Sequence, residues 1–104
     1  MEKTIVILEV IRSKTADDDQ KGKKIFAKIK ELAKQNVPGK IILDFRGIEL
    51  INTAFLNDAI GRLYDRDQFD IDRHPVLIIN MDPAAKDLVK ESIIVAKEKF
   101  AAKV

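Results

Sequence analysis

Asn52 and Thr53 form the first candidate site, because their polar side chains could bind a partner or accept a phosphate. Both are good N-cap residues, so we expect a helix to begin there. A hydroxyl group at a helix N-terminus is exposed, and a phosphate on it would be favoured by the helix dipole. Thr53 is therefore either a phosphoacceptor or only the residue that caps the helix. We favour the cap, because capping threonines are common.

Asp44 and Arg46 form a second candidate site. Asp44 ends a predicted parallel strand, and ligands usually bind at that edge of an open α/β sheet. The carboxylate could then serve as a catalytic group or a metal ligand. The alternative is that Asp44 anchors the following loop by accepting backbone N–H groups around Arg46 and Gly47. We favour the anchor and place a ligand at this edge only as the second hypothesis.

A charged segment at 65–74 invites a calcium site. It contains four aspartates, Asp65, Asp67, Asp70 and Asp72. Their spacing lacks the glycine and the terminal glutamate of an EF-hand loop, and Arg66 and Arg73 lie among them. A solvated loop is the better interpretation. His74 has no serine or cysteine spaced to form a catalytic dyad, so we predict no catalytic role for it.

The composition excludes several function classes. The 104 residues include no cysteine and one histidine, and the net charge is +2. Thiolate catalysis, disulfides and a histidine-rich metal site are thus excluded within one chain. The small basic excess argues against a dedicated nucleic-acid binder. The predicted first helix is basic, but no aromatic residues interleave for base stacking, so a solvent-facing surface is the favoured interpretation. Its lysines are Lys21, Lys23, Lys24, Lys28, Lys30 and Lys34.

The candidate residues are positioned by alternating strands and helices. Apolar runs at 4–11, 40–45 and 76–80 are typical of buried strands. Amphipathic stretches follow each of them, and they predict helices from the aspartates at 17–19 to about 35, from 52–53 to about 63, and from 83 toward 103. The stretch 48–51 has no clear form. The order β-α-β-α-β-α predicts a small, mostly parallel α/β sheet in one domain spanning 1–104.

Residues 41–63 read IILDFRGIELINTAFLNDAIGRL. They resemble the central signature of STAS domains, in which a buried strand ends in Leu-Asp and a glycine turn leads to an Asp-Ser-Ser-Gly-like loop that opens a helix. The closer likeness is to the bacterial STAS-like domains, which are uncharacterised and related to the anti-sigma-factor antagonists. The strand at 76–80 followed by the helix start at 82–88 is also similar, and the likeness extends over roughly 22–92.

The resemblance implies a function and also shows where this chain departs from it. Asn52 stands where the antagonists carry aspartate, Thr53 falls on the first serine, and Ala54 falls on the serine that the partner kinase phosphorylates. Phe55 replaces the glycine of the loop. We therefore expect a non-catalytic, regulatory protein-interaction module without the usual phosphoacceptor serine. Its partner would be a protein, plausibly an ATPase of the histidine-kinase type. The expected partner-binding or phosphoacceptor region comprises Asn52, Thr53, Phe55, Asn57 and Asp58.

The alternative function is the binding of a small ligand or nucleotide near Asp44. No Walker-type glycine-rich loop supports it. We expect no cofactor, no metal, no membrane contact and a cytoplasmic location. With three strands whose connecting helices share one face, the other face would be exposed, so we also expect a homodimer that covers it.

Overall fold

The computed structural model of the protein describes residues 2–35 and 39–101. A three-stranded sheet is formed by β1 (Lys3–Val6), β3 (Ile41–Asp44) and β5 (Val76–Ile79), in the order β1-β3-β5. Both strand pairs are parallel, and Ile5, Leu43 and Ile78 lie side by side in the register. The predicted fold class, a small parallel α/β sheet, is confirmed.

A second, very short parallel sheet joins β2 (Thr15–Ala16) to β4 (Leu50–Ile51). The amide of Asn52 also donates to the carbonyl oxygen of Ala16 at 3.1 Å. The sequence did not predict the form of the stretch 48–51 or a strand at Thr15. This ladder brings two distant chain segments together immediately before two helices begin.

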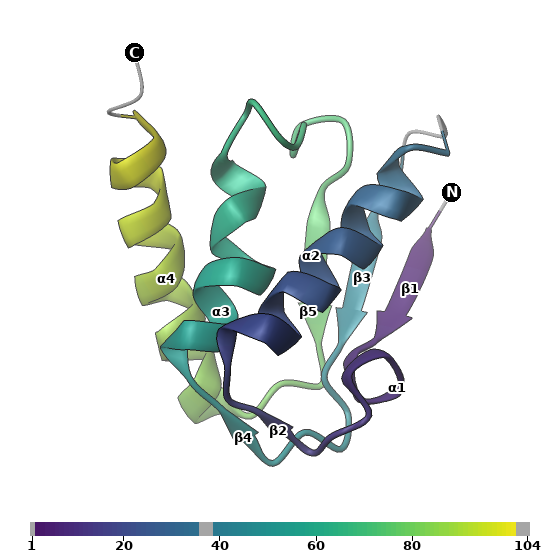
Figure 1. Cartoon of the computed structure of the whole chain (residues 1–104), viewed down its shortest axis with the longest axis vertical. Helices are drawn as coiled ribbons and strands as arrows, with labels where there is room; N and C mark the ends of the chain where they lie inside the picture. Colours follow the sequence, from purple (N-terminus) through teal and green to yellow (C-terminus); the bar gives the residue numbers. More distant parts are fainter. Residues whose placement is uncertain (1, 36–38, 102–104) are drawn as a thin grey trace.

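The helices follow the strands closely. They are α1 (Ile7–Ile11), α2 (Asp19–Ala33), α3 (Thr53–Ala59), the 3-10 helix η1 (Gly61–Tyr64) and α4 (Pro83–Ala101). Figure 1 shows α2 crossing one face of the sheet, with α3 beside it and α4 beyond α3. The predicted end of α4 near Lys103 lies outside the described residues. Helix α2 stops at Ala33, two residues before the predicted end.

The first predicted strand is wrong in its second half. The apolar run at 4–11 divides into β1 and the short helix α1. Ile7 and Ile11 are buried and lie four residues apart, so they share one face of a helical turn, while Glu9 between them is exposed. The turn ends at Arg12, which has a left-handed conformation (φ 53°). A short apolar run does not distinguish a strand from a buried helical turn.

The core lies between the sheet and the helices on one side of it. Leu43 is fully buried at the centre of the middle strand, and Ile25 and Ile29 of α2 are also fully buried. The other face of the sheet is less shielded from solvent. There Thr4 is exposed, Ile42 is half-buried and Leu77 is 48% exposed, and the three residues lie side by side.

Candidate functional site

Asn52 is the N-cap of helix α3, and both polar atoms of its side-chain amide form hydrogen bonds. Its Oδ1 accepts the backbone N–H of Phe55 at 3.1 Å, which is the N-cap bond. Its Nδ2 donates to the carbonyl oxygen of Asp17 at 2.7 Å. The predicted helix start is correct. The expectation that Thr53 caps the helix is wrong, because Thr53 is already the first helical residue.

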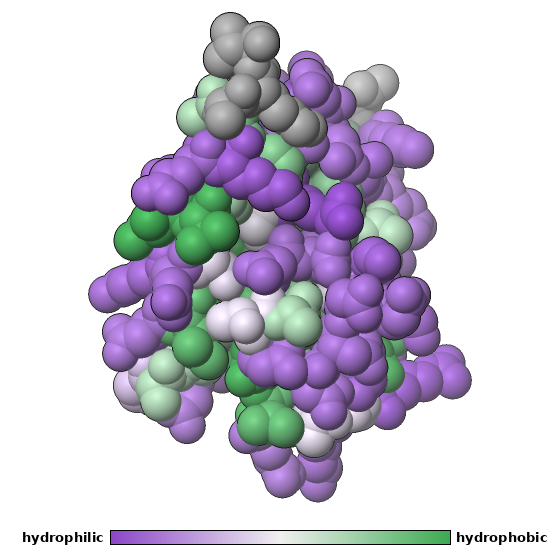
Figure 2. All heavy atoms as spheres, turned by 60° about the vertical axis from the view of Figure 1, so that its left-hand side comes forward, coloured by the Kyte–Doolittle hydropathy of each residue, from purple (hydrophilic) through white to green (hydrophobic). Residues whose placement is uncertain are grey.

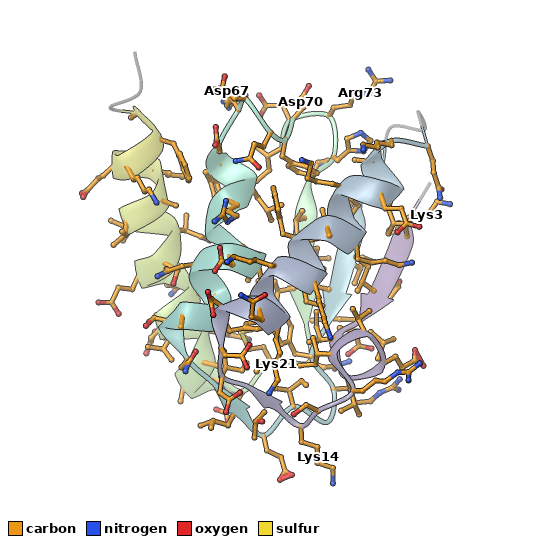
Figure 3. The ribbon with its side chains drawn as sticks, viewed as in Figure 1. Lys3, Lys14, Lys21, Asp67, Asp70 and Arg73 are labelled. Atoms are coloured by element: carbon orange, nitrogen blue, oxygen red, sulfur yellow. The ribbon has the colours of Figure 1, made fainter. Side chains whose placement is uncertain are left out.

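Helix α2 begins beside α3, and Lys21 fixes its first turn. Asp18 caps α2 by accepting the backbone N–H of Lys21 at 2.8 Å. The ammonium group of Lys21 points back toward β2, where it donates to the carbonyl oxygen of Thr15 at 2.9 Å and to Asp17 at 2.8 Å (Figure 3). The hydrogen bond from Lys21 lowers the pKa of Asp17 below its ordinary value. The segment that receives the Asn52 amide is therefore itself anchored.

The two helices approach each other most closely at Gly22. A Cβ atom on this residue would lie 2.5 Å from the carbonyl oxygen of Phe55 and 2.9 Å from Cβ of Asp58. Real Cβ atoms do not come this close to a backbone oxygen, so only glycine fits here. Because these contacts lie in the first turns of α3, Gly22 sets the position of the candidate site against α2.

The outer face at the start of α3 is accessible to a partner. Thr53, Ala54 and Asn57 are exposed on neighbouring turns. Phe55 is not part of this face, contrary to the expectation from sequence. It is fully buried and packs edge-on against Phe45, with ring centroids 6.4 Å apart. Its place in the region is that of an anchor for the helix, because a fully buried ring cannot contact a partner directly.

A groove continues from this face toward α4. It has a volume of about 450 Å³ and is lined by Asn57 and Asp58 of α3, by η1 and by Val95 of α4. Asp58 forms an ion pair with Arg62 four residues along the chain. Val95 is 52% exposed, and its neighbour Ile94 is 59% exposed. Figure 2 shows apolar areas separated by polar side chains on the side of the molecule where α4 lies.

Asp44, the other candidate, is turned inward. Its Oδ1 accepts the side-chain amide of Asn80 and the backbone N–H of Arg46, each at 2.9 Å. These two donors, Asn80 first, lower the pKa of the Asp44 carboxyl. The Asp44 side chain is 9% exposed, whereas the Arg46 side chain is 73% exposed. Asp44 thus ties the end of β3 to the end of β5, and Asn80 is a partner that the sequence analysis did not identify.

Carboxylates of the acidic segment at 65–74 form hydrogen bonds and an ion pair with other groups of the same segment. Asp65 is buried and accepts the side-chain amide of Gln68 at 2.9 Å, and Asp70 accepts the backbone N–H groups of Asp72 and Arg73. Arg66 pairs with Asp72 at 2.7 Å. Over residues 2–35 and 39–101, no three His, Cys, Asp or Glu side chains come together as a metal ion would require.

Residues 21–86, more than half of the chain, match the family described as a STAS-like domain of unknown function (DUF4325). The chain belongs to this family. None of the curated proteins and none of the solved structures matches it.

The matched residues can be located on the structure of the STAS-like domain. The match begins at Lys21, beside Gly22, and ends in the first turn of α4, so it includes the α2–α3 contact and the exposed start of α3. The resemblance inferred from residues 41–63 is confirmed. In the part of the STAS-like domain that the structure describes, no helix has the length and apolar character to cross a membrane.

The bond from Asn52 to Asp17 gives a first prediction. In Asn52→Asp the carboxylate still caps α3, but it cannot donate to the carbonyl oxygen of Asp17. We expect the free energy of unfolding at neutral pH to fall by about 1–3 kcal/mol, because an acceptor then faces an acceptor. Urea denaturation measures the change. Thr53→Ala is the matched control, and we expect it to lie within about 0.5 kcal/mol of the wild type. A larger loss in Thr53→Ala than in Asn52→Asp would contradict the assignment of the cap.

Proposed function

We propose that this STAS-like domain is a non-catalytic, regulatory module that binds a protein partner through the exposed start of α3. The observation that carries the proposal is the arrangement of Thr53, Ala54 and Asn57, which share an accessible helix face. Three contacts hold this face in place: the double hydrogen bond of Asn52, the fully buried ring of Phe55 and the close approach at Gly22. A rigid and exposed helix face is suited to partner recognition, because little ordering is needed on binding.

The groove beside this face extends the proposed contact surface to α4. Asn57 lines the groove from one side and Val95 from the other. Exposed apolar side chains next to polar ones are typical of partner surfaces. A protein with an apolar side chain to place against Val95 would contact both helices. The family resemblance makes an ATPase of the histidine-kinase type the partner to test first.

The rival hypothesis, a small ligand or nucleotide at Asp44, has less support. Both hydrogen bonds of Asp44 are made to Arg46 and Asn80 within the protein, so the carboxylate serves the sheet edge. A panel of nucleotides tested by thermal unfolding separates the two hypotheses, since a ligand that binds only the folded state raises its stability.

The experiment for the main proposal is a pull-down from the native host with a matched pair of variants. Ala54→Arg places a long cation on the proposed face, and Ala27→Arg makes the same change at an exposed position of α2 that faces the α1 side. We expect the captured protein to be lost with Ala54→Arg and retained with Ala27→Arg. Equal capture by both variants would show that the partner binds elsewhere.

A separate prediction is that the domain is not regulated by phosphorylation. Ala54 cannot accept a phosphate, and Thr53 lies one residue away, about 100° around the helix axis. A kinase adapted to the usual position should not use Thr53 efficiently. We therefore expect no phosphoryl group on the domain purified from its host, as measured by intact-protein mass spectrometry. An adduct that maps to Thr53 and disappears in Thr53→Ala would show instead that the switch has moved by one residue.

We also propose that the domain forms a homodimer through the open face of the sheet. This face is narrower than the sequence suggested, because residues 7–11 form a helix and do not extend β1. It still carries Leu77, which is 48% exposed, next to Ile42. We expect light scattering to give the mass of a dimer for the wild type and of a monomer for Leu77→Lys. A wild-type monomer at high protein concentration would contradict the prediction.

A further inference from the structure

A cavity of about 310 Å³ lies between the C-terminal end of α2 and the segment 65–74. Lys30 of α2 and Lys34, which follows the last residue of that helix, line it on one side. Phe69, Asp70, Arg73 and His74 line it from the segment. Figure 3 shows Asp70 and Arg73 on this segment, at the end of the molecule where α2 finishes. None of these residues belongs to the start of α3, although Gln68 lines both this cavity and the groove between α3 and α4.

His74 is the residue that points to a ligand. Its side chain is buried, with 5% of its surface exposed, and its ring lies against that of Phe69 with centroids 6.1 Å apart. Its backbone N–H donates to Asp70, but its ring nitrogens make no hydrogen bond to any described residue. Neither ring nitrogen is fully removed from solvent, so a ligand in the cavity can reach them. A polar group bound there would replace water as their hydrogen-bond partner.

The charges around the cavity favour an anion. Three cationic side chains line it against one carboxylate, that of Asp70, whose Oδ1 already accepts two backbone N–H groups. Three other lysines of α2 are paired with acids: Lys21 with Asp17, Lys23 with Asp19 and Lys28 with Glu31. Lys30, Lys34 and Arg73 have no such ion pair among the described residues. The end of α2 adds a partial negative charge of about half a unit, which three cations outweigh.

We propose that this cavity binds the phosphate group of a small metabolite. Guanidinium and ammonium groups form charge-assisted hydrogen bonds with phosphate oxygens, and a neutral imidazole can donate one more. The volume lies at the lower end of the range for small-molecule sites, about 300–1,000 Å³, so a phosphate monoester fits better than a dinucleotide. The proposal does not depend on the partner surface at α3.

The test uses the fact that His74 is the only histidine of the chain. Its ring signals in an NMR spectrum are therefore assigned without further work. The protein is titrated with inorganic phosphate, and separately with glucose 6-phosphate, at fixed pH and at an ionic strength held constant with chloride. We expect the His74 signals to shift saturably with both phosphates. The absence of a saturable shift would overturn the proposal.

A matched pair of variants tests the specificity of the site. Arg73→Gln removes a cation that lines the cavity, and Arg66→Gln removes one from the same segment that does not. We expect Arg73→Gln to weaken phosphate binding by about tenfold or more, in line with the strength of hydrogen bonds to charged groups. Arg66→Gln should bind as the wild type does. Equal weakening in both variants would show that phosphate responds only to the overall charge of the surface. Urea midpoints equal to that of the wild type establish that both variants fold.

Discussion

Replacing Gly22 with alanine is expected to lower the free energy of unfolding by about 3 kcal/mol or more. The added methyl group would lie 2.5 Å from the carbonyl oxygen of Phe55, and a backbone atom in a packed helix cannot move aside cheaply. Helix propensity alone would favour alanine by about 1 kcal/mol, so a loss of stability must come from the contact. Urea denaturation, with far-UV circular dichroism as the signal, measures the change.

Gly61→Ala is the matched control for this substitution. A Cβ atom at Gly61 would meet Cβ of Ala96 at 3.5 Å, which is an ordinary van der Waals contact. We expect Gly61→Ala to be neutral or slightly stabilising, because alanine restricts the unfolded chain more than glycine does. If Gly22→Ala proved as stable as Gly61→Ala, helices α2 and α3 would have to lie farther apart than described here.

Leu43→Ala is the second substitution with a large expected effect. Leu43 is fully buried at the centre of β3, between Ile5 of β1 and Ile78 of β5. Removing its side chain leaves a cavity that the flanking strands cannot close, so we expect a loss of about 2–5 kcal/mol. That is a large share of the total stability of a small domain, roughly 5–15 kcal/mol. The measurement is the shift of the urea midpoint.

Leu50→Ala is the matched control, because it makes the same chemical change at a side chain that is largely exposed. Leu50 is 52% exposed on β4, so its truncation should cost less than about 1 kcal/mol. A midpoint for Leu43→Ala equal to that of Leu50→Ala would place Leu43 outside the core.

The elements that sequence predicted well are those with strong local signals. Asp18 and Asn52 mark the starts of α2 and α3 with capping side chains, and Pro83 opens α4. These signals act over three or four residues, so they can be read without knowing the fold. Asn52 and Thr53 are both good caps, however. Only the bond from Asn52 to the N–H of Phe55 decides between them.

The features that sequence missed depend on contacts between distant segments. The β2–β4 ladder has two residues in each strand, and its pairing joins Thr15 to Leu50. Asn80 reaches Asp44 across 36 positions because β3 and β5 are neighbours in register. The unpaired imidazole of His74 becomes visible only when its burial is known. The residues around each partner do not indicate which distant residue it contacts, so such contacts cannot be predicted from local sequence.

The β2–β4 ladder has a consequence for how the domain opens. It closes a chain loop that contains all of α2 and β3, and both α2 and α3 begin within three residues of it. Opening the ladder together with the bonds from Asn52 to Ala16 and Asp17 would free the starts of both helices at once. Local unfolding at this end should therefore be cooperative, with the amides of the two first helical turns exchanging with solvent as one unit.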